Sequence, residues 1–168
     1  AAGVDHIQVR ERDMDAGPLL RVVSAVVAAC RGTRTHVLVN DRVDVALAAG
    51  AHGVHLRADS PPAWRIRALV PKDFVIGRSV HDVDGLADAD GLDYVVAGTV
   101  WTTSSKPEGH VLIGESGLAA IVAASPVPVL AIGGVDASRV PRVARCGAAG
   151  LAAIGLFLAP ERAAPMTP

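Results

Sequence analysis

The chain has 168 residues, of which 51% are apolar and 3% aromatic, and it carries a formal net charge of −1. This length and apolar content suffice for one hydrophobic core, so we expect a single domain over residues 1–168. A net charge near zero and few aromatic side chains argue against a nucleic-acid partner, and no apolar run is long enough to suggest a membrane partner.

Short apolar strands alternate with helix-like segments along the whole sequence. The expected strands cover residues 6–10, 35–39, 53–56, 74–77, 94–96, 127–132 and 150–153, and the expected helices cover 17–29, 42–49, 62–70, 83–89, 116–124 and 137–145. Four strands follow a similar turn that contains a glycine, at Gly3, Gly50, Gly91 and Gly147. Regular strand–helix alternation is typical of βαβ units and predicts an α/β fold with a parallel sheet.

Seven strands, the first of them entered from the end of a helix at Ala1–Gly3, are best explained by a TIM (βα)8 barrel. Such a barrel would lack its first βα unit and part of its last helix. The exposed sheet edges of an incomplete barrel would indicate a shortened sequence. A doubly wound open sheet is the alternative, but no G-x-G-x-x-G motif follows a strand. Residues 158–168 are predicted to form a frayed tail.

The strand over 127–132 leads directly into a glycine turn. Gly133 and Gly134 allow the backbone to approach a ligand closely, and Asp136 is suited to cap a following helix. Free N–H groups at the start of a helix attract anions, above all phosphate. A tight turn without a ligand is the alternative, since glycine-rich turns are common.

In a barrel, the chemistry is expected at the carboxyl ends of the strands, and these ends are polar here. Strand alternation places Gln8 and Arg10 on one face, toward the barrel interior, with Ile7 and Val9 on the other. Arginines, a lysine, hydroxyl groups and glycine amides suit a site for two phosphate-bearing partners. Asp41 and Asp59 could add a position for Mg²⁺. The polar residues are Gln8, Arg10, Glu11, Arg12, Asn40, Asp41, Arg42, His55, Arg57, Asp59, Arg78, Ser79, His81 and Thr102–Lys106.

Several of these residues also have a purely structural interpretation. Residues 10–12 could form a solvated ion-pair cluster, and Asp41 could simply cap the helix that follows it. His52 and His55 point to opposite faces of a strand, which favours structural histidines over a metal site. His81 could serve packing or catalysis.

Six segments in order resemble thiamine-phosphate synthase and its close relative, the thiazole tautomerase. The resemblance runs from Ile7 to Phe157 and implies a (βα)8 barrel. It also implies a transferase of thiamine biosynthesis, which joins a hydroxymethylpyrimidine diphosphate to a thiazole phosphate with release of pyrophosphate and the help of Mg²⁺. The segments that carry it are Ile7–Asp13, Leu38–Leu47, Gly53–Leu56, Ile76–His81, Ala131–Val135 and Gly147–Ile154.

The resemblance assigns roles to individual positions, with Arg10, Lys106 and Ser79 as the catalytic residues. The diphosphate side would be held by Gln8, Arg10, Arg12 and Asn40, with Ser79 on the diphosphate or pyrimidine. The metal would be bound by Asp41, with Asp59 as a weaker candidate. The loop around the thiazole phosphate and pyrophosphate would be formed by Thr103, Ser105 and Lys106. Backbone amides for the thiazole phosphate would come from Gly133, Gly134, Ile154 and Gly155.

Two departures from the synthase pattern and one from the tautomerase pattern leave other functions open. Arg57 replaces a glycine that synthases have after His55-Leu56, and Ser60 stands where they have a second metal-binding carboxylate. The acid/base histidine of the tautomerase is replaced by Thr99, which cannot transfer that proton near neutral pH. A thiazole tautomerase, or a non-catalytic regulatory relative that binds phosphate ligands, therefore remains an alternative. Asp41 favours the synthase.

The cysteines and the alanine-rich surface bear on location and assembly. Cys30 and Cys146 lie in helix-like surroundings without a partner motif, which predicts a reduced, cytoplasmic protein. An alanine-rich surface and the family resemblance together suggest a homodimer. The expected partners are otherwise small phosphorylated substrates.

Overall fold

The protein is described by a computed structural model, which covers residues 3–107 and 109–158. The chain divides into two compact units, one with residues 3–78 and 90–93, the other with residues 79–89 and those from 94 onward. Each unit is described by itself, and the single domain over 1–168 stays a prediction. The expected helix end at Ala1–Ala2 and, apart from Leu158, the expected tail lie outside the described residues.

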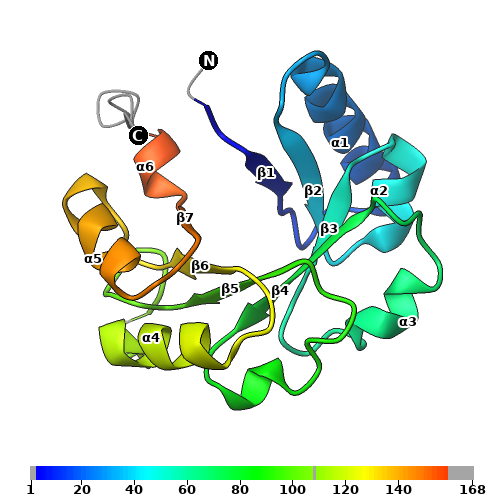
Figure 1. The fold of residues 1–168 in the computed structure, drawn as a ribbon. Helices are drawn as coiled ribbons and strands as arrows, with labels where there is room; N and C mark the ends of the chain where they lie inside the picture. Colours follow the sequence, from blue (N-terminus) through cyan, green and yellow to red (C-terminus); the bar gives the residue numbers. More distant parts are fainter. Residues whose placement is uncertain (1–2, 108, 159–168) are drawn as a thin grey trace. The chain divides into compact units, whose positions relative to one another are not determined.

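The first unit is built around four parallel strands, which neighbour one another in chain order. They are β1 (His6–Val9), β2 (His36–Asn40), β3 (Gly53–Leu56) and β4 (Val75–Val80), the last two residues of β4 belonging to the second unit. The helices are α1 (Ala16–Cys30), α2 (Val43–Ala49) and α3 (Ala63–Arg67), and α1 packs against α2 (Figure 1). The register pairs Gln8 with Leu38 and Asn40 with His55, so the carboxyl ends of β1–β3 lie at one edge.

The second unit is built around three parallel strands, again in chain order. They are β5 (Tyr94–Gly98), β6 (Val129–Ile132) and β7 (Gly150–Ala152). Its helices are α4 (Gly114–Ala124), α5 (Val140–Arg145) and α6 (Gly155–Leu158), with 3-10 turns η1 (Asp84–Leu86) and η2 (Ala137–Arg139). Every residue of β5 is buried, as expected for a parallel strand covered on both faces.

Branched aliphatic side chains form the core of each unit. The fully buried ones of the first unit include Leu19, Val23, Val37, Leu38, Val39, Val54 and Ile76, and those of the second include Val95, Leu118 and Ile121. Cys30 and Cys146 are both free thiols. Within the described residues, no helix has both the length and the hydropathy needed to span a membrane.

All seven predicted strands are present and parallel, which confirms the α/β fold. One of the predicted helices is wrong, because residues 83–89 form only the short turn η1. Asp82 Oδ1 accepts a hydrogen bond from the N–H of Gly85 at 2.8 Å. Aspartate side chains that bond nearby backbone in this way compete with a helix, and glycine weakens the helix further. Residues 137–145 also begin as a 3-10 turn and become an α-helix only at Val140.

Strand β1 departs from the predicted alternation. Val9 is buried, but Ile7 is 38% exposed, and Gln8 is exposed as well. Among the described residues β1 pairs with β2 alone, so it forms an edge of the sheet in this unit. An edge strand buries less of each face than a central strand does. An interior position for Gln8 and Arg10 therefore stays a prediction.

Candidate functional site

Three arginines lie close together at the carboxyl ends of β1 and β3, in the first unit. The pKa of Arg10 is lowered by burial and then by the charges of Arg12 and Arg57. Arg12 and Arg57 line a hollow of about 320 Å³ together with Asn40 and Asp41. Guanidinium groups remain charged in proteins, so their proximity favours a ligand with several negative charges. The complete lining is Glu11, Arg12, Asp13, Met14, Asn40, Asp41, Arg42 and Arg57.

Asp41 is held in an uncommon backbone conformation directly after β2. Its φ is 61°, and its N–H donates to the carbonyl of His55 at 2.9 Å. Left-handed backbone is unfavourable for residues other than glycine, although aspartate tolerates it better than most, and it is common at functional sites. Helix α2 begins after Arg42 without a side-chain cap, so the interpretation of Asp41 as a helix cap is wrong.

Arg57 connects the two carboxylates that were predicted to bind Mg²⁺. Its Nε donates to Asp59 Oδ1 at 2.8 Å, and its NH2 donates to Asp59 Oδ2. Its NH1 lies 4.0 Å from Asp41 Oδ2. Ser60 Oγ donates to Asp41 Oδ1 and accepts from the N–H of Arg57 at 2.9 Å. Hydrogen bonding to Arg57 lowers the pKa of the Asp59 carboxyl, so this group is ionised at neutral pH.

His55 is buried on β3, beside the arginine cluster. It is 5% exposed, and burial, followed by the charge of Arg10, lowers its pKa to about 4, while Asp41 opposes the shift. His52 is exposed, accepts a hydrogen bond from the N–H of Val37 at 3.0 Å and stacks on His36. The two histidines therefore lie in separate environments, as the strand alternation predicts.

Acidification is expected to destabilise the protein through His55. Its pKa is about 4 in the folded chain against 6.5 for the free side chain, so between these values the unfolded chain binds more protons. The contribution of His55 to the free energy of unfolding is complete above pH 6.5 and falls as the pH decreases, by about 3 kcal/mol in all. Urea unfolding between pH 7 and pH 4 measures this loss, which His55→Asn should reduce. An NMR resonance of His55 that titrates near pH 6.5 would contradict the assignment.

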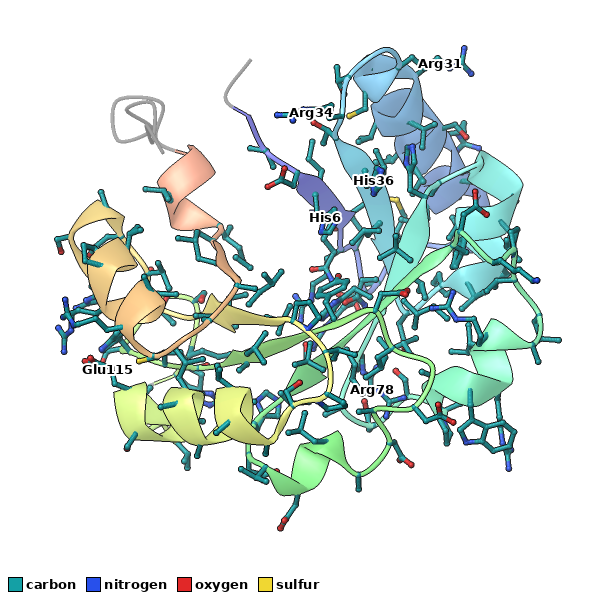
Figure 2. All side chains as sticks on the ribbon, viewed as in Figure 1. His6, Arg31, Arg34, His36, Arg78 and Glu115 are labelled. Carbon is teal, nitrogen blue, oxygen red and sulfur yellow. The ribbon has the colours of Figure 1, made fainter. Side chains whose placement is uncertain are left out.

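Arg78 is buried on β4 and holds the loop after β3. It is 3% exposed, and its NH2 donates to the carbonyls of Ser60, at 3.3 Å, and Pro61. Figure 2 labels this side chain among the sticks of the ribbon view. The sequence placed Arg78 among the polar residues at a strand end, whereas it lies within β4. The structure gives Arg78 a part in positioning the Arg57–Ser60 loop.

The second unit contains the glycine turn after β6. Gly133 and Gly134 have φ values of 100° and 65°, and a Cβ atom on Gly133 would overlap the side chain of Thr99. Asp136 Oδ1 accepts from the N–H of Arg139 at 3.1 Å, as its predicted capping role requires. Arg139 in turn donates to the Gly134 carbonyl and lies over the Trp101 ring, with its Cζ 5.3 Å from the centroid. The turn is thus fixed on several sides.

The other predicted residues of this unit lie near strand ends. The register pairs Ile132 with Ala152, which brings the glycine turn alongside the exposed Ile154 and Gly155 after β7. The loop Thr102–Lys106 contains a short turn, in which the N–H of Lys106 donates to the Thr103 carbonyl at 3.3 Å. The Thr103 and Ser105 hydroxyl groups lie 3.2 Å apart. Ser79 is half-buried on β4.

Two histidine contacts of the second unit were not apparent from sequence. His110 Nε2 lies 3.0 Å from Thr99 Oγ1, and Thr99 is 4% exposed. His81 Nδ1 is hydrogen-bonded to the Gly98 carbonyl. Residues eleven or seventeen positions apart meet only through the tertiary fold, so spacing alone gave no signal.

The structure brings together Arg10, Arg12, Asn40, Asp41 and Asp59 in the first unit, as predicted from the strand ends. Arg57 was noted among the polar strand ends but given no role in the predicted site, although it forms ion pairs with both acidic residues. The available signal was its position directly after β3, two residues before Asp59. Gln8 lies on β1 opposite Leu38 and is exposed.

Sequence comparison relates the chain to thiamine-phosphate synthases. A family model described as thiamine monophosphate synthase matches residues 1–157. A thiamine-phosphate synthase from Methanoregula boonei is 42% identical over 156 residues, which cover 92% of this chain and 72% of that protein. Another from Chlorobium limicola is 40% identical over 154 residues, which cover 90% of this chain and 73% of that protein.

Solved structures agree with the sequence comparison. Thiamine phosphate pyrophosphorylase from Pyrococcus furiosus matches with a TM-score of 0.83 and 30% identity, over 96% of this chain and 78% of that protein. A 3-hexulose-6-phosphate synthase matches with a TM-score of 0.69 and 22% identity, over 96% of this chain and 84% of the other, and at this identity the likeness shows the fold alone. The chain therefore belongs to the thiamine monophosphate synthase family.

Proposed function

We propose that the chain is a transferase that joins a hydroxymethylpyrimidine diphosphate to a thiazole phosphate, giving thiamine phosphate and pyrophosphate. The observation that carries this proposal is the convergence of Arg10, Arg12 and Arg57 beside a hollow of about 320 Å³. A diphosphate matches such a cluster because its charges are concentrated on a few oxygens. The 42% identity to a thiamine-phosphate synthase supports the same reaction.

The diphosphate side of the reaction is assigned to the first unit. Arg10, Arg12 and Asn40 are proposed to bind the diphosphate, with Gln8 as a further contact on the family resemblance. Departure of pyrophosphate places negative charge on the leaving oxygens, and fixed guanidinium groups stabilise that charge. The pyrimidine methylene cation is then captured by the thiazole nitrogen. Such a reaction needs positioning and charge stabilisation rather than a strong base.

The thiazole phosphate is assigned to the turns after β6 and β7 in the second unit. Backbone amides of Gly133, Gly134, Ile154 and Gly155 are the proposed donors, and the positive φ values of both glycines in the turn support this assignment. Thr103, Ser105 and Lys106 are proposed to contact the thiazole phosphate or pyrophosphate. Ser79 stays a proposed contact of the diphosphate or pyrimidine, with Lys106 and Arg10 as the other catalytic candidates.

A (βα)8 barrel in which these strands are the second to the eighth is the proposed architecture. The sequential parallel order of the strands within each unit supports it. So does the TM-score of 0.83 to the Pyrococcus furiosus protein. A cytoplasmic location and a homodimer also stay proposals.

A Mg²⁺ ion bound by Asp41 and Asp59 is expected from the family resemblance, but the donor set does not fit a two-carboxylate site. Both oxygens of Asp59 accept hydrogen bonds from Arg57, and Asp41 Oδ1 accepts one from Ser60. Within the described part of the chain, no group of three or more histidine, cysteine, aspartate or glutamate side chains is placed to hold a metal ion. We therefore derive no step of the reaction through a metal ion.

The proposal is tested by incubating the purified chain with both substrates and measuring thiamine phosphate and pyrophosphate by chromatography. We expect both products in equal amounts, and the assay is run with Mg²⁺ and with a chelator. A folded protein that forms no thiamine phosphate under either condition would refute the synthase. Isomerisation of the thiazole alone would instead identify a tautomerase, for which the His110–Thr99 pair offers an imidazole.

A further inference from the structure

We propose that the Arg57 guanidinium, held between Asp41 and Asp59, takes the place of a bound divalent metal ion on the diphosphate side of this site. The chain would then bind a pyrophosphate group through Arg57 without a metal. This inference rests on the proposed function, because it concerns the leaving group of that reaction. It differs from the family pattern, which has glycine and a second carboxylate where this chain has Arg57 and Ser60.

The positions of the two carboxylates support the inference first. Asp59 is held by a two-point contact with Arg57, through Nε at 2.8 Å and through NH2. Asp41 accepts from Ser60 and faces Arg57 NH1 at 4.0 Å. Mg²⁺ needs free oxygen ligands in near-octahedral geometry. Here a guanidinium lies between the carboxylates that would supply them, so the positive charge of the ion is already provided by the protein.

The remaining hydrogen-bonding capacity of Arg57 supports the inference second. Its Nε and NH2 are used on Asp59, whereas NH1 lies beyond hydrogen-bond distance of Asp41. The Arg57 side chain is 46% exposed and lines the hollow beside Arg12. Guanidinium groups bind phosphate oxygens through paired N–H donors. Arg57 thus has an accessible edge that can donate to a phosphate, while Asp59 fixes its orientation.

The loop that carries Arg57 is itself held in place. Ser60 Oγ accepts from the N–H of Arg57 at 2.9 Å, and the buried Arg78 donates to the carbonyls of Ser60 and Pro61. A guanidinium on a restrained loop loses less conformational freedom when it binds an anion than one on a mobile loop. The Ser60 hydroxyl therefore has a second role here, as the link between the loop and Asp41.

The direct test is calorimetric titration of the chain with inorganic pyrophosphate in a chelator and in Mg²⁺. We expect binding in the chelator, and Arg57→Gln should weaken it by about 10- to 100-fold, the range for loss of a charged hydrogen bond. Arg34→Gln is the control, because Arg34 is exposed in the turn after α1 and does not line this hollow. A change below about 3-fold is expected for it. Equal losses for the two variants, or binding that strictly requires Mg²⁺, would overturn the inference.

A second test restores the family pattern with the double variant Arg57→Gly, Ser60→Asp. We expect this variant to acquire a Mn²⁺ site, seen by electron paramagnetic resonance, and to need a divalent ion for pyrophosphate binding. Stoichiometric Mn²⁺ binding to the unaltered chain without pyrophosphate would contradict the inference.

The readouts also separate this inference from the proposed synthase function. Binding of pyrophosphate that depends on Arg57, without thiamine phosphate formation, supports this inference and refutes the synthase. Thiamine phosphate formation by the unaltered chain, with unchanged pyrophosphate binding by Arg57→Gln, would support the synthase and refute this inference.

Discussion

Replacing Arg10 with alanine is expected to lower kcat/KM for thiamine phosphate formation by about 10²- to 10³-fold, the usual effect of removing one donor that stabilises developing charge. Arg10 lies where the charges of Arg12 and Arg57 both act on it. An anion bound among these three groups interacts with Arg10 directly, and its charge increases at the leaving oxygens during the reaction. Steady-state measurement of pyrophosphate release, with each substrate varied in turn, gives the change.

Two controls make the Arg10 result specific. Arg10→Lys keeps the charge but lacks the planar pair of donors, so it should recover part of the lost activity. Arg34→Ala removes a positive charge from the exposed turn after α1 and should change kcat/KM by less than about 2-fold. A loss below about 5-fold for Arg10→Ala, with circular dichroism unchanged, would remove Arg10 from the proposed site.

Gly133→Ala is expected to lower the free energy of unfolding by about 2–4 kcal/mol, through two separate effects. The φ of 100° is unfavourable for any residue with a Cβ atom. The added methyl group would also overlap the Thr99 side chain, which is 4% exposed and has little room to move. Urea unfolding of the variant and the unaltered chain at neutral pH measures the difference.

Gly32→Ala separates the two effects on stability. Gly32 has a φ of 76° but no atom within 4 Å of an added Cβ, so its substitution introduces the backbone strain alone, about 1 kcal/mol. The double variant Gly133→Ala, Thr99→Ser removes the Thr99 methyl group and should recover part of the loss. Equal losses for Gly32→Ala and Gly133→Ala would mean that contact with Thr99 does not require glycine at this turn.

Much of the secondary structure could be predicted because it depends on local chemistry. The strands are apolar runs bounded by turn residues, and the glycine turns before four of them have the positive φ that only glycine adopts freely. The helix predicted over 83–89 is absent for a reason that is also local but is harder to recognise in the sequence. Its apolar residues have helical spacing, yet the Asp82 side chain bonds the Gly85 backbone and favours a turn.

The site was predicted less completely than the strands. Strand order places Asn40 at the end of β2, Asp41 directly after it and Asp59 after β3, and neighbouring parallel strands bring these ends together. The orientation of Arg57 did not follow from this reasoning. A charged side chain after a strand can point to solvent, to a neighbouring carboxylate or to a ligand, and sequence spacing does not distinguish these directions.

The amino-acid sequence alone was enough to predict the strands, their parallel pairing in chain order and the chemical character of the strand ends. These predictions rest on side-chain periodicity, on glycine conformation and on the similarity of six short segments to one family. Which charged side chains meet became clear from the folded structure and not from the sequence. Asp41, directly after β2, meets Arg57 and Ser60 of the loop after β3. The burial of His55 likewise depends on the packing around β3. Electrostatic interactions depend on distance and burial, which are set by packing between segments that are separate in the sequence.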